Sequence, residues 1–189
     1  MAPPIEKEFE DKVKEAKALQ EELEAELSKE VLPALEDADR AIDLLEMRDM
    51  AELKAIKKPE EQVLKVMKTL VAVLYNMDDA SHDDWRKKAS SYLVEDMRRF
   101  DRDDPAIANV ALDKINAHFL DEQVSVENME KFTGPRIAKV ITKWLFAMQV
   151  YIKKFCDIKP RRDKLKTLHE ELEKLHKLKD EAAKSKASK

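Results

Sequence analysis

Apolar residues at both ends of the chain follow the spacing of coiled-coil helices. Between Trp144 and Ile158 they recur at alternating steps of four and three residues, and a similar alternation runs through much of the segment from Phe9 to Leu45. The N-terminal segment is also rich in Glu, Ala, Lys and Leu, which favour helix. The pattern predicts two long helices, over residues 5–45 and 144–184, each on the order of 60 Å long at about 1.5 Å per residue.

The C-terminal seam of apolar residues is flawed at a proline. Pro160 lacks a backbone donor and crowds the carbonyl group four residues before it, so we expect the helix to bend there or its neighbour to make room. Between Ile158 and Leu165 the seam continues only through Arg161 or Arg162. Two paired helices could slip along each other at such a flaw.

The N-terminal seam has a flaw of its own. Between residues 23 and 35 the apolar positions are separated by three consecutive steps of four, a stutter that locally unwinds a heptad pattern, and Pro33 lies within it. Upstream, one phase of the seam passes through Leu19 and another through Gln20. Two phases of similar quality imply two registers of similar energy.

The segment between the long helices, residues 47–143, lacks a sustained heptad pattern. It contains about six short amphipathic stretches, of which residues 60–75 are apolar almost all round and are expected to form a core. Asp49 is expected to cap a first short helix that starts at Met50. We therefore predict an all-α fold, an antiparallel coiled-coil hairpin (stalk) capped by a small globular bundle of about six helices. The predicted parts are a first stalk helix (1–46), a head (47–143), a second stalk helix (144–184) and a disordered tail (185–189).

Charge is distributed unevenly along the chain. Residues 1–46 hold 15 acidic and 6 basic side chains, a net charge of −9, whereas residues 159–189 hold 6 acidic and 11 basic ones, a net charge of +5. Opposite charges favour pairing of the two arms with each other. Self-association into a plain dimeric coiled coil is the alternative for either arm alone.

Composition excludes several classes of function. A single Gly in 189 residues, with 40% charged side chains, fits an almost wholly helical chain and leaves no glycine-rich phosphate-binding loop. The single Cys permits no disulfide framework, so we expect a reducing, intracellular compartment. The start has no signal-like apolar segment and no run is long enough to span a bilayer, so we expect no membrane contact.

No group of side chains predicts catalysis or metal binding. The segment 101–104 begins like a calcium-binding loop, but Ala106 stands where such a loop needs Gly and Leu112 where it needs Glu. His169 and His176 are seven residues apart on a helix, which is too far to share one metal ion. We expect no catalytic residue, no metal and no cofactor in this chain.

Four residues and three segments of the chain form a specific pattern. The residues are Trp144, Tyr151, Pro160 and Leu165, and the segments are ALEDADRAIDLL, MAELKAIKKPEE and DDWRKKASSYL. Together they resemble the stalk and microtubule-binding domain of dynein heavy chains. The most specific feature is the spacing of the four residues, which is similar to the family's outgoing stalk helix. The resemblance covers the whole chain.

The resemblance implies a track-binding head on an antiparallel coiled-coil stalk. In this family, sliding of one stalk helix along the other links the nucleotide state of a distant AAA+ motor ring to affinity for the track. Pro33 and Pro160 resemble the family's stalk prolines, and the two seam phases fit a switch between two packings of one sequence. The ATP-hydrolysing parts of such a motor have no counterpart here, so we expect this chain not to be an enzyme and to belong to a longer protein.

The resemblance also implies which residues contact the track. The family's contacts with tubulin α and β lie on the first, third and sixth helices of the head. Because tubulin's surface is strongly acidic, a salt-screened basic patch would steer the head and hold it weakly enough for release. Matching positions assign contacts to Arg48, Lys54, Arg86, Lys87, Glu127, Lys131 and Arg136.

The class of dynein can be narrowed by comparison with the family pattern. The linker 78–84 lacks the long flap of some axonemal inner-arm chains, and the fifth and sixth helices match the cytoplasmic pattern poorly. These features favour an axonemal, outer-arm heavy chain in the cytoskeleton of a cilium or flagellum. Some outer-arm heads that resemble this one bind a leucine-rich-repeat light chain, for which the exposed face of the fifth helix is the expected site.

Two other functions are compatible with a coiled-coil hairpin. An adaptor or scaffold would hold a protein partner without binding a track, and charge reversal at Lys54, Arg86 and Lys131 would leave that partner bound. A hairpin that binds nucleic acid is the other, but the acidic first arm and the neutral head provide no continuous basic stripe for phosphates. We therefore expect no nucleic-acid partner.

Overall fold

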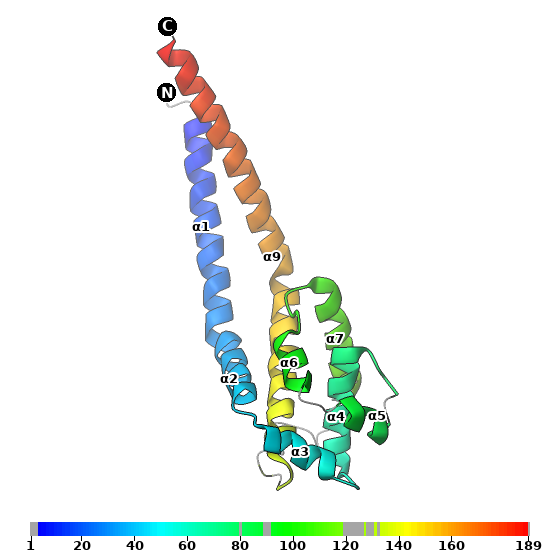
Figure 1. The fold of residues 1–189 in the computed structure, drawn as a ribbon. Coiled ribbons are helices and arrows are strands. Elements are labelled where there is room, and N and C mark those ends of the chain that lie inside the picture. The colour runs from blue at the N-terminus through cyan, green and yellow to red at the C-terminus, as the bar shows by residue number, and fades with distance from the viewer. Residues whose placement is uncertain are drawn as a thin grey trace. The chain divides into compact units, whose positions relative to one another are not determined.

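The computed structural model describes residues 4–79, 81–88, 92–118, 127, 131 and 133–188. All regular structure in these ranges is helical, which confirms the all-α prediction. The predicted sixth helix of the head falls almost entirely outside the described residues. The helices labelled in Figure 1 are α1 (Pro4–Glu30), α2 (Leu32–Asp43), α3 (Met47–Ala55), α4 (Glu61–Tyr75), α5 (His82–Lys88), α6 (Tyr92–Arg98), α7 (Pro105–His118) and α9 (Arg136–Ala187).

The chain divides into two compact units. Unit 1 combines residues 1–30 with residues 154–189, and unit 2 comprises residues 31–153. Unit 1 therefore contains α1 and the C-terminal part of α9, while α2 to α7 and the N-terminal part of α9 belong to unit 2. On both sides, unit 2 extends beyond the segment that the sequence suggested as the head.

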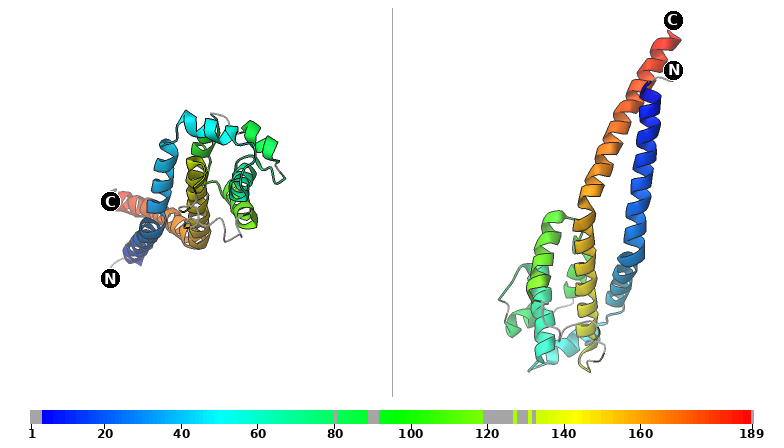
Figure 2. Two further views of the ribbon diagram at one scale, coloured as in Figure 1. Left: turned by 90° about the horizontal axis from the view of Figure 1, so that it is seen from below. Right: turned by 180° about the vertical axis from the view of Figure 1, so that it is seen from behind.

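Unit 1 is a pair of antiparallel helices. α1 and the C-terminal part of α9 lie side by side in the views of Figures 1 and 2. Ala16 and Leu23 of α1 are buried, as are Ile158 and Leu168 of α9. These apolar residues form the narrow seam that is typical of paired helices whose remaining faces are solvated.

The structure selects one of the two phases that the sequence allowed in each helix of unit 1. In α1, Leu19 is half-buried whereas Val13 and Gln20 are exposed, so the seam follows the phase through Leu19. In α9, Arg161 is half-buried and Arg162 is exposed, so Arg161 occupies the seam position after Ile158. A charged side chain therefore lies where a coiled coil usually has an apolar one.

The proline within α9 does not end the helix. α9 continues through Pro160, whose side chain is exposed. Proline donates no backbone hydrogen bond, but at an exposed position water can hydrate the neighbouring carbonyl groups.

Both ends of α9 lie beyond the predicted second stalk helix, residues 144–184. The helix begins at Arg136, directly after Pro135, and it extends to Ala187. Residues 185–187 are thus helical where a disordered tail was predicted. The reason is that this segment contains Ala and Lys, which favour helix, and no Gly or Pro that would end it.

The single long helix predicted over residues 5–45 is wrong, because the chain forms two helices with a break at Val31. Pro33 lies in the first turn of α2, where a backbone N–H needs no partner within the helix. Its ring disfavours helical geometry in the residue before it and removes a bond to the preceding turn. Val31 is buried, and its carbonyl group accepts a hydrogen bond from the N–H of Leu35, which starts the new helix.

The core of unit 2 is built around α4, as the sequence predicted. Val66, Met67 and Leu70 are completely buried, and α4 packs against α7 and α5. The N-terminal part of α9 contributes Trp144, whose ring meets that of Phe100 edge-on with 5.6 Å between the ring centres. α5, which packs against this core, carries Arg86 and Lys87, two of the residues predicted to contact the track.

No helix in the described ranges combines the length and the apolar character that crossing a bilayer requires.

Candidate functional site

Three of the predicted contact residues lie at one end of unit 2. Arg48 and Lys54 lie on α3, which joins the C-terminal end of α2 to the segment before α4, and Arg136 is the first residue of α9. A guanidinium nitrogen of Arg136 donates a hydrogen bond to the carbonyl oxygen of Leu44 at 3.2 Å. We call this region the α3 end: residues 44–60 with the first turn of α9. Figures 1 and 2 show α3 lying across this end of unit 2, with α5 close by.

The start of α3 is fixed by a reciprocal cap. Glu46 is the N-cap residue, and its backbone N–H donates a 2.7 Å hydrogen bond to the carboxylate of Asp49. α3 therefore begins at Met47, and the expectation that Asp49 caps a helix starting at Met50 is wrong. Asp49 is only 4% exposed, and Arg136 lies 4.0 Å from its carboxylate. The same buried acid thus orders α3 and attracts the first residue of α9.

Three of the predicted contact cations are held by acids of this chain. Arg48 pairs with Glu46 at 2.9 Å and Arg136 faces Asp49. Lys131 lies 3.8 Å from Glu127, and both side chains are strongly exposed. Any partner that binds Arg48, Arg136 or Lys131 must compete with these carboxylates, so the net gain from such a contact is reduced.

The other predicted cations are not paired with an acid in the part of the chain that the structure describes. Lys54 on α3 and Arg86 and Lys87 on α5 make no ion pair within the described part of the chain, and Lys54 and Lys87 are exposed. Lys87 also contributes to the low pKa of the Asp84 carboxyl, which chiefly reflects hydrogen bonds from Ser81. These three cations are available to an external acidic group.

The sequence analysis did not identify two further exposed lysines that could contact an acidic partner. Lys57 and Lys58 are exposed in the loop after α3 and make no ion pair among the described residues. The signal was present, because a Lys-Lys pair before Pro59 marks a solvated loop directly after a helix that already carries Lys54. With Arg86 and Lys87 these three lysines form what we call the basic group: Lys54, Lys57, Lys58, Arg86 and Lys87.

The remaining charges of unit 2 that pair across helices mainly hold α2. Three of its four acids each meet a cation from another segment, while Glu36 pairs with Arg40 of the same helix. The pairs are Asp37 with Lys143 at 2.8 Å, Asp39 with Arg102 at 3.2 Å and Asp43 with Arg98 at 2.9 Å. The Lys143 ammonium group lowers the pKa of the Asp37 carboxyl.

The loop between α6 and α7 joins α2 to α9 within unit 2. Arg102 pairs with Asp39 and also lies over the ring of Tyr151, 5.8 Å from its centre. The hydroxyl group of Tyr151 donates a hydrogen bond to the carboxylate of Asp103. Tyr151, which helped to identify the family from sequence, thus has a structural role within unit 2, where it links α9 to the loop before α7.

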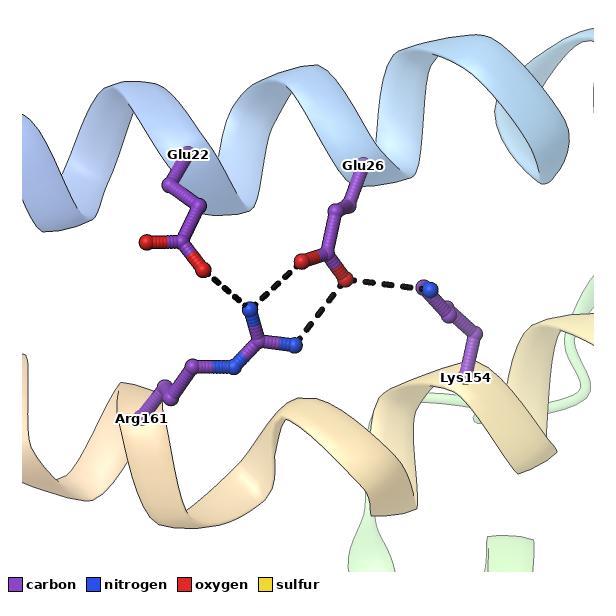
Figure 3. A network of polar contacts seen from close by, with 4 residues as sticks. All are labelled: Glu22, Glu26, Lys154 and Arg161. Atoms are coloured by element: carbon purple, nitrogen blue, oxygen red, sulfur yellow. Dashed lines mark hydrogen bonds and ion pairs between the residues drawn. The ribbon is translucent and has the colours of Figure 1, made fainter.

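Unit 1 contains a four-residue charge network, shown in Figure 3. Arg161 donates hydrogen bonds to Glu22 at 2.5 Å and to both carboxylate oxygens of Glu26, at 2.5 and 2.9 Å. Lys154 approaches Glu26 from the same helix as Arg161, at 3.0 Å. The hydrogen bonds from Arg161 and then Lys154 lower the pKa of the Glu26 carboxyl to about 2.

Further pairs extend this pattern along unit 1 and define a register. Glu15 meets Lys164 at 2.6 Å, and Lys12 meets Glu171 at 2.5 Å. Near the ends, the ring of Phe9 lies against His176 and under the ammonium group of Lys179. Partners in α9 move toward the C-terminus as positions in α1 move toward the N-terminus, so the two helices are antiparallel with one consistent alignment.

The segment 101–104 has a structural explanation that involves no metal. A carboxylate oxygen of Asp101 accepts hydrogen bonds from the backbone N–H groups of Asp103 and Asp104, which forms the turn before α7. Within the described ranges, no group of three or more His, Cys, Asp or Glu side chains is arranged to hold a metal ion.

Comparison with known proteins agrees with these features. The family model for the microtubule-binding stalk of dynein motors matches residues 1–188. The chain is 30% identical over 147 residues to the dynein-1-beta heavy chain of the flagellar inner arm I1 complex of Chlamydomonas reinhardtii, and 28% identical over 133 residues to the human and mouse dynein axonemal heavy chain 2. These alignments cover 75% and 70% of this chain and 3% of each relative. With nearly the whole length matched by the family model, the chain belongs to the family of microtubule-binding stalks of dynein motors.

Proposed function

We propose that this chain binds microtubules through the basic group and the α3 end of unit 2, and that the register of α1 against α9 in unit 1 controls the affinity. The domain is the stalk of a dynein heavy chain, a non-catalytic part of the motor. The observation that carries the proposal is the position of the five cations of the basic group, which lie on α3, on the loop after it and on α5 and make no ion pair among the described residues.

Electrostatics supports an acidic partner such as tubulin. Other cations of unit 2 without an ion pair in the described ranges, Lys68, Arg99 and Lys153, are separated along α4, after α6 and on α9. The basic group instead concentrates positive charge on neighbouring elements, which steers an acidic surface toward it and weakens with salt. Among the residues predicted from sequence, we rank Lys54 first, since it is exposed and makes no ion pair among the described residues that a partner would have to replace.

Regulation by register is supported by the two phases of the seam. The ion pairs of Arg161, Lys164 and Lys12 all fit the alignment that places Leu19 in the seam. A shift of one helix along the other would exchange these partners and would move the chain connection at Val31, two residues before Pro33. A change of register could thereby be transmitted along the chain to α2 and the α3 end.

We also propose an axonemal location and a light-chain partner for this chain. The named relatives are axonemal dynein heavy chains, which favours the cytoskeleton of a cilium or flagellum; one of them belongs to an inner arm, so the outer-arm expectation gains no support. Ile107 and Val110 on α7, the predicted fifth helix of the head, are 43% and 48% exposed. They offer an apolar surface on which a leucine-rich-repeat light chain could bind.

The test is co-sedimentation with stabilised microtubules over a series of salt concentrations. We expect the parent protein to bind at low salt, to bind less as salt rises, and to lose more than about tenfold in affinity on Lys54→Glu, because the reversal replaces attraction by repulsion. Lys153→Glu is the matched control, because it makes the same charge change away from the α3 end. Lys153 lies about 25 Å along α9 from Arg136, which belongs to that end.

Two results would contradict the proposal. Absence of binding by the parent protein at every salt concentration would favour the adaptor or scaffold function. Equal losses in Lys54→Glu and Lys153→Glu would show that net charge, rather than the basic group, determines the affinity.

A further inference from the structure

The corner between α2 and α3 presents two apolar side chains to solvent. Leu44 is 65% exposed and Met47 is 79% exposed, which makes Met47 the most exposed large hydrophobic residue in the described part of the chain. A single exposed apolar side chain is ordinary on a protein surface. Leu44 and Met47 lie three residues apart, on either side of the N-cap of α3, and together expose more apolar surface than one isolated side chain; we call these two residues the patch.

The backbone of this corner is held in place. The N–H of Leu44 donates to the carbonyl group of Arg40 at 3.2 Å, and its own carbonyl group accepts a hydrogen bond from Arg136. Leu45 and Glu46 are fixed by bonds to Ile42 and Asp49. Both exposed side chains therefore project from an ordered backbone, which reduces the entropy lost when a partner covers them.

The patch is continuous with the proposed track-binding residues. Met47, Ala51 and Lys54 are spaced four and three residues apart, so they form one exposed stripe along α3. The opposite face of the helix is buried through Asp49, Met50 and Leu53. A partner that reaches Lys54 along this stripe would also cover Met47.

We infer that Leu44 and Met47 form an apolar contact with the microtubule surface, at the edge of the basic group. This inference rests on the proposed function and adds a second component to it. Exposed ion pairs are weak and screened by salt, whereas apolar burial does not depend on ionic strength in the same way. Interfaces commonly combine an apolar centre with a charged rim, and Met adapts well to an irregular partner surface.

The experiment compares salt dependence in matched variants. The double variant Leu44→Gln, Met47→Gln removes the apolar contact without changing charge, and we expect affinity to fall about five- to tenfold at low and at moderate salt alike. Lys54→Gln should behave differently, because the loss of one charge should be larger at low salt and shrink as salt rises. Met47→Leu should bind like the parent protein.

Ile107→Gln, Val110→Gln is the control, since it makes a similar change on exposed apolar residues of α7. It should bind microtubules like the parent protein. Thermal unfolding by circular dichroism should be unchanged in both double variants, because all four side chains are exposed in the folded protein.

The outcomes distinguish this inference from the function on which it rests. Parent-like binding of Leu44→Gln, Met47→Gln at both salt concentrations overturns the apolar contact and leaves the basic group intact. A loss that disappears at moderate salt also overturns it, because the corner would then act through charge. Failure of the parent protein to bind at any salt concentration overturns both proposals together.

Discussion

Charged side chains have different surroundings in the two units. In unit 1, Arg161 and Lys154 meet Glu22 and Glu26 across two helices. In unit 2, the five cations of the basic group make no ion pair within the described ranges, although Lys87 lies near enough to Asp84 to lower the pKa of its carboxyl. The difference shows that the abundance of charge alone does not separate cations used within the chain from cations available to a partner. The informative residues are the cations that make no ion pair among the described residues.

The comparison also distinguishes two uses of an arginine. Arg161 occupies a seam position and is satisfied by two carboxylates, so it specifies which residues of α1 and α9 face each other. A polar residue at such a position is known to specify register in coiled coils at some cost in stability. Arg48 lies on an exposed face and has one acid nearby, Glu46, which a partner could replace.

The largest effect, on the thermal stability of unit 1, is expected from reversing the charge of Arg161. Arg161→Glu would place a third acid beside Glu22 and Glu26, so unit 1 should lose helical signal at a clearly lower temperature than in the parent protein. Adding Glu26→Arg should restore part of the loss by re-forming a pair of opposite charge. Thermal unfolding followed by far-ultraviolet circular dichroism measures both changes.

The control for this prediction is Lys159→Glu. Lys159 is exposed two residues away on the same helix and has no ion pair in the described part of the chain. If Lys159→Glu lowers the unfolding temperature as much as Arg161→Glu, then overall charge and not the network of Figure 3 stabilises unit 1.

A smaller effect on the stability of unit 1 is expected when the pH is lowered. The pKa of the Glu26 carboxyl is about 2 in the folded protein against an ordinary value of 4.5. Because the folded-state pKa is the lower one, the stabilising contribution is fully present above about pH 4.5 and is lost as the pH falls toward 2. Helical signal from unit 1 should therefore melt at progressively lower temperatures over this range.

Glu26→Gln tests whether that carboxylate is responsible. The variant should already be less stable at neutral pH, and its unfolding temperature should fall less between pH 4.5 and pH 2 than that of the parent protein. Glu24→Gln is the matched control, because Glu24 is exposed on α1 and has no ion pair among the described residues. An identical acid response in parent and Glu26→Gln would contradict the prediction.

The sequence predicted most of the helices because their signals are local. The apolar character of α4 all round and the heptad spacing around Trp144 depend on residues close together in the chain, and both led to buried elements. The break at Val31 was missed because Pro33 was interpreted as a flaw within one helix rather than as the first turn of the next. Propensity alone did not separate these two cases.

The alignment of the stalk helices could not be predicted because it depends on contacts between distant segments. Leu19 and Gln20, like Arg161 and Arg162, are almost equivalent by spacing within their own helices. The choice depends on which carboxylates of α1 lie across from Arg161. The same limit applies to Arg136, whose place beside the buried Asp49 links residues far apart in sequence.

The smallest effect, on microtubule affinity, is expected where a predicted contact cation already forms an ion pair with an acid of the same chain. Glu46→Gln removes the negative charge 2.9 Å from Arg48 while keeping a side-chain oxygen that can accept the capping hydrogen bond. Microtubule affinity should rise about twofold at low salt, since an exposed ion pair of this kind contributes little. Co-sedimentation of the single variant Glu46→Gln is compared with that of the double variant Arg48→Gln, Glu46→Gln. The comparison determines whether the gain in affinity depends on Arg48. If the gain persists without Arg48, the lost acid repelled the track directly, and Arg48 is not a contact residue.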